Sequence, residues 1–151
     1  MSSTYNVERF ASSIDSTTVT KLEKFIHDFY SASDTPPPTS TPDPYLEYFT
    51  EDAYLKVALN EVIGLTRIQA LRQGLWVRVK QMKHQVQDVA QLSATEFLWT
   101  GTVLYLLVND KELLTEWSAY ARFSDNSLTK MCFYHVYLDS SQSKAALAEQ
   151  A

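Results

Sequence analysis

Apolar residues recur at two different spacings along the chain, and the change of spacing separates a helical first half from a strand-rich second half. In residues 17–33 they recur every three or four positions, which is the period of a helix with one buried face. From His84 onward apolar and polar residues alternate, which is the period of a β-strand. The pattern therefore predicts an α+β fold in which helices precede a sheet of long antiparallel strands.

The first half contains two amphipathic helices. The apolar stripe of the helix predicted over residues 17–33 consists of Val19, Leu22, Phe25, Ile26, Phe29 and Tyr30. Residues 35–44 are rich in proline and exclude both a helix and a central strand. Asp43 followed by Pro44 is typical of a helix start, so a short helix is expected to follow, and then a short strand over residues 53–59.

The second long helix is predicted over residues 64–82, with Thr66 as its cap. Its buried stripe would be formed by Ile68, Leu71, Leu75, Val79 and Met82. Its solvated basic side would be formed by Arg67, Arg72, Arg78, Lys80 and Lys83. Four strand-like runs follow, over residues 84–92, 96–109, 112–124 and 127–139.

A curved sheet wrapped on these helices buries the apolar faces of both. We therefore expect a cone-shaped α+β barrel with a hollow end. The predicted organisation is a polar arm over residues 1–16, one domain over residues 17–139 and a polar tail over residues 140–151.

Composition excludes several classes of function. The net charge of −5 argues against nucleic acid as a partner, and three glycines are too few for a phosphate-binding glycine loop. One cysteine, Cys132, forms no intramolecular disulfide, which favours a cytoplasmic setting. No apolar run is long enough for membrane insertion, and the three histidines show no metal-ligand spacing. We therefore expect no metal and no cofactor.

The chain resembles the nuclear transport factor two-like superfamily, and within it the SnoaL-like and scytalone dehydratase-like branch. The resemblance covers residues 17–139 and rests on FTEDA at residues 49–53, GLTRI at residues 64–68 and a histidine that opens the next strand. It implies a cone-shaped pocket and frequent homodimers. Members include isomerases, cyclases, dehydratases, epoxide hydrolases and non-catalytic binders, so the resemblance specifies the fold more closely than the reaction.

The catalytic signatures of this superfamily are met only in part. The Arg and Asp set of limonene-epoxide-hydrolase relatives is absent, and Lys56 and Val57 stand where ketosteroid-isomerase relatives carry a carboxylate base. The aspartate that SnoaL-type cyclases place near the end of the final strand is matched only in a shifted position, by His135 or Asp139. The scytalone dehydratase-like pattern fits best, because it is matched by His84 and Tyr30.

His84 is the main candidate for proton transfer, since a histidine pKa lies near neutrality. The alternative is that it fills space and bonds a carbonyl. His135 enters the pocket if the face that it shares with Phe133 and Tyr137 is concave, and lies at a dimer surface if that face is convex. Glu116 is a candidate acid or base on its strand, or the ion-pair partner of a nearby arginine. The matched Tyr30 completes the predicted catalytic residues.

Aromatic residues are numerous enough both to fill a core and to line a pocket. The predicted substrate-binding residues are Tyr54, Trp99, Tyr105, Trp117 and Tyr120. Two hypotheses follow. One is a cofactor-independent enzyme that isomerises, cyclises, dehydrates or rearranges a small hydrophobic metabolite of secondary metabolism, and that forms a homodimer. The other is a non-catalytic ligand-binding or dimerisation module of the same fold.

Overall fold

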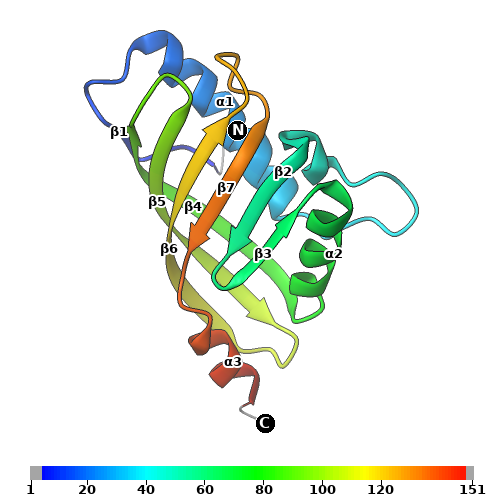
Figure 1. Cartoon of the computed structure of the whole chain (residues 1–151). Coiled ribbons are helices and arrows are strands. Elements are labelled where there is room, and N and C mark those ends of the chain that lie inside the picture. Colours follow the sequence, from blue (N-terminus) through cyan, green and yellow to red (C-terminus); the bar gives the residue numbers. More distant parts are fainter. Residues whose placement is uncertain (1–4, 149–151) are drawn as a thin grey trace.

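The computed structural model describes residues 5–148 and confirms the predicted α+β class (Figure 1). Three α-helices and a short 3-10 helix accompany a strongly curved sheet that does not close on itself. The helices are α1 (Ser16–Ser33), η1 (Pro44–Tyr48), α2 (Leu65–Trp76) and α3 (Ser141–Ala148). The strands are β1 (Arg9–Phe10), β2 (Phe49–Val57), β3 (Asn60–Ile63), β4 (Val79–Gln91), β5 (Glu96–Leu107), β6 (Glu112–Phe123) and β7 (Met131–Tyr137).

The first helix and the short helix form as the sequence predicts. Asp15 caps α1 by accepting a hydrogen bond from the backbone N–H of Thr18 at 2.8 Å, which satisfies one of the free donors of the first turn. Asp43 caps η1 in the same way, with Pro44 at the first helical position. The buried side chains of α1 are those of the predicted stripe, and they pack against the concave face of the sheet.

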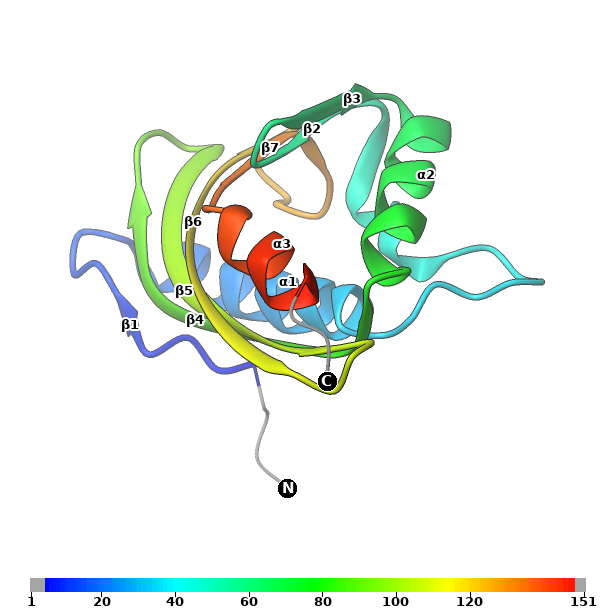
Figure 2. The same cartoon turned by 90° about the horizontal axis from the view of Figure 1, so that it is seen from below.

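The sheet has the strand order β1-β4-β5-β6-β7-β2-β3. The long pairs β4–β5, β5–β6 and β6–β7 are antiparallel, whereas β2 runs parallel to β7 and β1 runs parallel to β4. Figure 2 looks along the cone and shows the sheet curving around α1, with α2 on the open side and α3 in the opening. Side chains therefore face either the interior of the cone or its outer surface, in alternation along each strand except where the register shifts in the β2–β7, β4–β5 and β6–β7 pairings.

The prediction of one long helix over residues 64–82 is wrong. The helix α2 ends at Trp76, and Val79 already pairs with Leu107 as the first residue of β4. Val79 and Met82 are three residues apart, which is helical spacing, yet a register shift between Val79 and Gln81 lets both line the cavity from β4. Pairing with β5 over the whole length of the strand decides for the strand. The N-cap is Gly64 at φ 92° rather than Thr66.

Both ends of the described chain add an element to the predicted cone. The backbone of Arg9 and Phe10 pairs with Asp88 and Val89 in β4, and α3 follows β7. The outermost parts of the predicted arm and tail, residues 1–4 and 149–151, lie outside the described residues. Between residues 5 and 148, no helix has the length and apolar character that a membrane crossing requires.

Candidate active site

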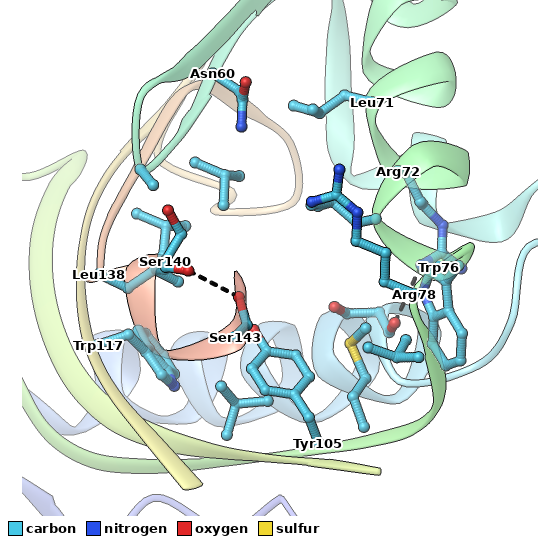
Figure 3. A pocket seen from close by; sticks show the side chains of 18 of the residues that line it. Asn60, Leu71, Arg72, Trp76, Arg78, Tyr105, Trp117, Leu138, Ser140 and Ser143 are labelled. Atoms are coloured by element: carbon cyan, nitrogen blue, oxygen red, sulfur yellow. Dashed lines mark hydrogen bonds between the residues drawn. The ribbon is translucent and has the colours of Figure 1, made fainter. Parts of the chain in front are cut away.

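The interior of the cone retains a cavity of about 220 Å³ (Figure 3). It lies between α1, α2, α3 and the concave sides of β4 to β7, and most of its lining side chains are apolar or aromatic. The polar lining residues that matter below are His84, Tyr105, Trp117, Arg78 and Lys144. A concave apolar site with a few polar groups is the usual form of a small-molecule site.

His84 projects from β4 into this cavity and is paired with a buried carboxylate. Its ring Nδ1 lies 2.5 Å from Oδ1 of Asp34, and its backbone N–H donates to Oδ2 of Asp34 at 2.8 Å. The side chain of Asp34 is only 5% exposed and that of His84 is 16% exposed. An ionised carboxylate only accepts hydrogen bonds, so Nδ1 is the donor, and in the neutral form of the imidazole Nε2 is then the acceptor.

Asp34 is held in place by the end of α1. It is the C-cap of that helix, and its backbone N–H bonds the carbonyls of Tyr30 and Ala32. The guanidinium of Arg72 in α2 donates to the carbonyls of Ala32, Ser33 and Thr35 at 3.1, 3.1 and 2.6 Å. The carbonyls on either side of Asp34 are thus tied to a second helix, which fixes the carboxylate opposite His84.

Arg72 itself is buried, which corrects the prediction that it belongs to a solvated basic face. Its Nε donates to Oδ2 of Asp43 at 2.7 Å, and the two side chains are 5% and 1% exposed. Its guanidinium also lies 4.6 Å from the centre of the Tyr45 ring. A buried charge requires such a partner, and here Asp43 serves both as the cap of η1 and as the counter-ion of Arg72.

Tyr5 of the N-terminal segment reaches the same carboxylate. Its hydroxyl donates to Oδ2 of Asp34 at 2.8 Å, and the ammonium of Lys83 lies 3.9 Å from the centre of its ring. Burial and the neighbouring Asp34 raise the pKa of Tyr5 well above its usual value, so its hydroxyl stays protonated and donates. Asp34 therefore accepts three hydrogen bonds, from Tyr5 and twice from His84.

The ring of Tyr30 lines the cavity, while its hydroxyl is hydrogen-bonded to two other aromatic residues in the core. That hydroxyl lies 2.7 Å from the hydroxyl of Tyr134 and accepts a hydrogen bond from the indole Nε1 of Trp99 at 2.9 Å. Burial raises the pKa of both tyrosines, so both stay neutral. The centre of the Tyr30 ring lies 4.9 Å from that of His84, which packs the imidazole against an aromatic wall.

Two further lining residues offer hydrogen-bond donors. The hydroxyl of Tyr105 makes no hydrogen bond within residues 5–148, and burial raises its pKa to about 12. Trp117 is 5% exposed, and its indole Nε1 has no hydrogen-bond partner in the described part of the chain. The centre of the Trp117 ring lies 5.7 Å from that of His84, which places this donor beside the candidate base.

The structure does not bring the remaining predicted site residues into the cavity. Glu116 and Tyr120 alternate with Trp117 along β6 and face outward, and His135 alternates with the cavity-lining Tyr134 along β7. Tyr54 also faces outward, where its ring stacks on Phe133 at 4.6 Å. Burial and the nearby Lys56 lower the pKa of His135. Trp99 is buried below the cavity, where it supports Tyr30.

Sequence reasoning missed Asp34, Asp43 as a counter-ion, and the role of Arg72. Asp34 looks like an ordinary helix end before a proline-rich loop, and only the fold places it beside a residue that is 50 positions away. Its position directly after α1, four residues after the matched Tyr30, was the available signal. Among residues 5–148, no group of three or more His, Cys, Asp or Glu residues lies close enough to hold a metal ion.

Known structures share this fold at very low sequence identity. No protein-family model and no curated protein matches the sequence. An NTF2-like protein of unknown function from Burkholderia pseudomallei has a TM-score of 0.68 and 10% identity, over 89% of this chain and 100% of that one. A putative SnoaL-like polyketide cyclase from Jannaschia sp. CCS1 has a TM-score of 0.68 and 11% identity, over 93% and 98%.

A fungal enzyme is also similar. BvnE pinacolase from Penicillium brevicompactum has a TM-score of 0.63 and 12% identity, over 89% of this chain and 98% of that one. The likeness extends over nearly the whole of each neighbour, so the cone described here is the NTF2-like fold. Identities of 10–12% establish the fold and leave the reaction to be argued from the site.

Proposed function

We propose that the protein is a cofactor-independent enzyme of secondary metabolism that moves a proton on a small hydrophobic, oxygenated substrate. The observation that carries this proposal is the pairing of His84 with the buried Asp34 at the wall of an apolar cavity. Similarity in fold to a protein described as a putative polyketide cyclase and to a pinacolase supports an enzyme of this kind. Isomerisation, cyclisation, dehydration and rearrangement of an oxygenated substrate can each begin with such a proton transfer.

Each residue has a defined part in the proposed reaction. Asp34 orients the imidazole through Nδ1, so Nε2 of His84 removes a proton from the carbon next to a substrate carbonyl. The electrons of the broken C–H bond move to the carbonyl oxygen, and the hydroxyl of Tyr105 donates a hydrogen bond to the resulting enolate. Return of the proton to another carbon gives an isomer, and its delivery to a departing hydroxyl gives water and an alkene.

The apolar walls contribute by holding the substrate and excluding water. Aromatic rings of Tyr30 on α1 and Trp117 on β6 flank the imidazole, and both line the same cavity. Electrostatic interactions are stronger in such a site than in water, which favours both the Asp34–His84 pair and the enolate. A cyclisation that is directed mainly by the shape of the cavity requires little more than these apolar walls.

The test follows proton transfer without knowledge of the natural product. We expect the protein to catalyse exchange of the α-protons of 1-tetralone in D₂O, measured by mass spectrometry in the presence of a chelator. Substitution His84→Gln is expected to lower the exchange rate by about 10²-fold or more, and Asp34→Asn to lower it as well because the amide no longer enforces the tautomer. Tyr54→Phe, outside the cavity, is the control and should keep the full rate.

Exchange by the wild-type protein at the buffer rate would contradict the proposal, as would an undiminished rate in His84→Gln. The alternative of a non-catalytic ligand-binding or dimerisation module would then be favoured. One observation bears on assembly in either case, because the outer face of the sheet exposes large apolar side chains at Leu98, Leu104, Leu114 and Tyr137. We infer that two copies associate through this face as a homodimer.

A further inference from the structure

Two cationic side chains line the cavity without an acidic partner. Arg78 and Lys144 are both lining residues and both are exposed, and the lining contains no Asp or Glu. Within the described chain neither side chain takes part in an ion pair, whereas Arg72 is neutralised by Asp43. Figure 3 shows the side chain of Arg78 reaching from the connection between α2 and β4 toward the middle of the cavity.

The position of Arg78 is set by the backbone. Its N–H bonds the carbonyl of Leu75 at 3.3 Å and its carbonyl accepts from the N–H of Val108 at 3.1 Å, so the residue is tied both to α2 and to the hairpin between β5 and β6. Lys144 lies on α3, which occupies the opening of the cone in Figure 2. The two cations therefore stand where the cavity meets solvent.

An unpaired donor lies in the buried part of the cavity. The indole Nε1 of Trp117 is buried and lacks a partner in the described part of the chain, and buried polar groups are rarely left unpaired. A ligand oxygen that accepts from this N–H would remove the cost of desolvation. The site thus offers a buried hydrogen-bond donor beside His84 and positive charge at the entrance of the cavity.

The volume limits the size of the ligand. A cavity of about 220 Å³ lies below the range of roughly 300–1,000 Å³ that is usual for drug-sized ligands. It suits a molecule of one or two rings better than an extended polycyclic one.

We propose that the substrate is a compact apolar carboxylate that carries a carbonyl or ether oxygen at its far end. Arg78 and Lys144 bind the carboxylate at the mouth, the rings lie beside His84, and Trp117 donates to the far oxygen. Arginine suits this role because its planar guanidinium matches a carboxylate with two parallel hydrogen bonds. This substrate class deepens the proposed function and rests on it for the identity of the reacting site.

Binding of three related probes tests both ends of the site by calorimetry. The probes are 6-acetyl-2-naphthoate, its primary amide, and 2-naphthoate, which lacks the ketone. We expect the acetyl-naphthoate to bind about tenfold or more tightly than the amide. Substitution Arg78→Met should remove this preference, because it weakens the binding of the two carboxylate probes and not that of the amide. Arg67→Met, which makes the same change on the exposed side of α2 outside the cavity, should leave it intact.

The ketone end is tested separately by the indole signals. In a ¹H–¹⁵N spectrum the Trp117 indole signal should shift when acetyl-naphthoate is added, and it should shift much less with 2-naphthoate. The indole signal of Trp99 serves as the internal reference, because its Nε1 is already hydrogen-bonded to Tyr30. Substitution Trp117→Phe should weaken the binding of acetyl-naphthoate several-fold and should change the binding of 2-naphthoate little.

Three results would overturn the inference. These are equal affinity of the acetyl-naphthoate and its amide for the wild-type protein, an equal effect of Arg67→Met and Arg78→Met, and no binding of any of the three probes. Because none of these measurements needs turnover, they fail independently of the exchange assay that tests His84.

Discussion

At the scale of single residues, Gly101 shows how tightly the site is built into the sheet. A Cβ placed on this residue would lie 2.1 Å from the carbonyl oxygen of Gln85 and 2.7 Å from Cζ2 of Trp117. Gly101 pairs with Val86 in β4 and with Trp117 in β6, so the strand that carries His84 and the indole beside it pack directly on the glycine. The lack of a side chain is what lets both approach.

Substitution Gly101→Ala is therefore expected to lower the free energy of unfolding by about 1–3 kcal/mol or more, because the backbone of Gln85 cannot yield as a flexible side chain does. Chemical denaturation measures this change. Gly74→Ala is the matched control, since no atom lies within 4 Å of its added Cβ in α2, and it should stabilise by about 0.5–1 kcal/mol. Equal effects of the two substitutions would contradict the packing role of Gly101.

At the scale of elements, the proposed dyad depends on the packing of α2 against the end of α1. Arg72 joins the two helices and η1 through Asp43 and the carbonyls around Asp34. The carboxylate of Asp34 is therefore positioned by a residue of α2 that bonds the backbone carbonyls around it. Such a link couples the stability of the helix pair to the geometry of the site.

We expect Arg72→Met to lower the free energy of unfolding by about 3–5 kcal/mol, because Asp43 is left as a buried unpaired charge. The exposed Arg67 provides the comparison, and Arg67→Met should change the stability by less than about 0.5 kcal/mol. Thermal or chemical unfolding distinguishes the two. A small loss in Arg72→Met would mean that this ion pair contributes little to holding the end of α1.

At the scale of the whole molecule, the curvature of the sheet divides its residues between a cavity and an outer surface. Leu104 and Leu114 are direct partners across β5 and β6 on the outer surface, and they are 41% and 61% exposed. Tyr137 is also exposed on that face, on β7. Several exposed apolar side chains on one face of a sheet are the feature expected of a homodimer interface.

Substitution Leu114→Asp should therefore convert the proposed dimer to a monomer by placing a charge in the interface, with the dissociation constant raised about tenfold or more. Light scattering after size-exclusion chromatography measures the mass. Leu92→Asp changes an exposed leucine in the turn between β4 and β5 and should leave the dimer intact. A wild-type protein that is monomeric at micromolar concentration would show that the face does not associate.

Much of the fold could be predicted because it depends on local spacing. The stripe from Leu22 to Tyr30 requires a helix with one buried side, and the alternation around Trp117 requires a strand with two distinct faces. The boundary between α2 and β4 could not be placed in this way, because Val79 and Met82 have helical spacing and line the cavity together only through the register shift after Val79. Pairing with β5 resolved it.

The candidate site was predictable only in part. His84, Tyr30, Tyr105 and Trp117, four of the predicted site residues, line the cavity, and their roles stay predictions. Whether His135 faced inward depended on the concave side of the sheet, which periodicity cannot identify because both faces of β7 carry aromatic residues. The bend of the sheet around α1 decides that side.

The sequence by itself determined which residues share a face, since helical and strand periods are properties of neighbouring residues. It also determined the class of fold, because two amphipathic helices followed by long alternating strands have few ways to bury their apolar sides. Only the tertiary structure decided that Asp34 meets His84, that Arg72 is buried, and that Arg78 reaches the cavity. These contacts join residues far apart in the chain, and they follow from strand register and sheet curvature, which no local pattern encodes.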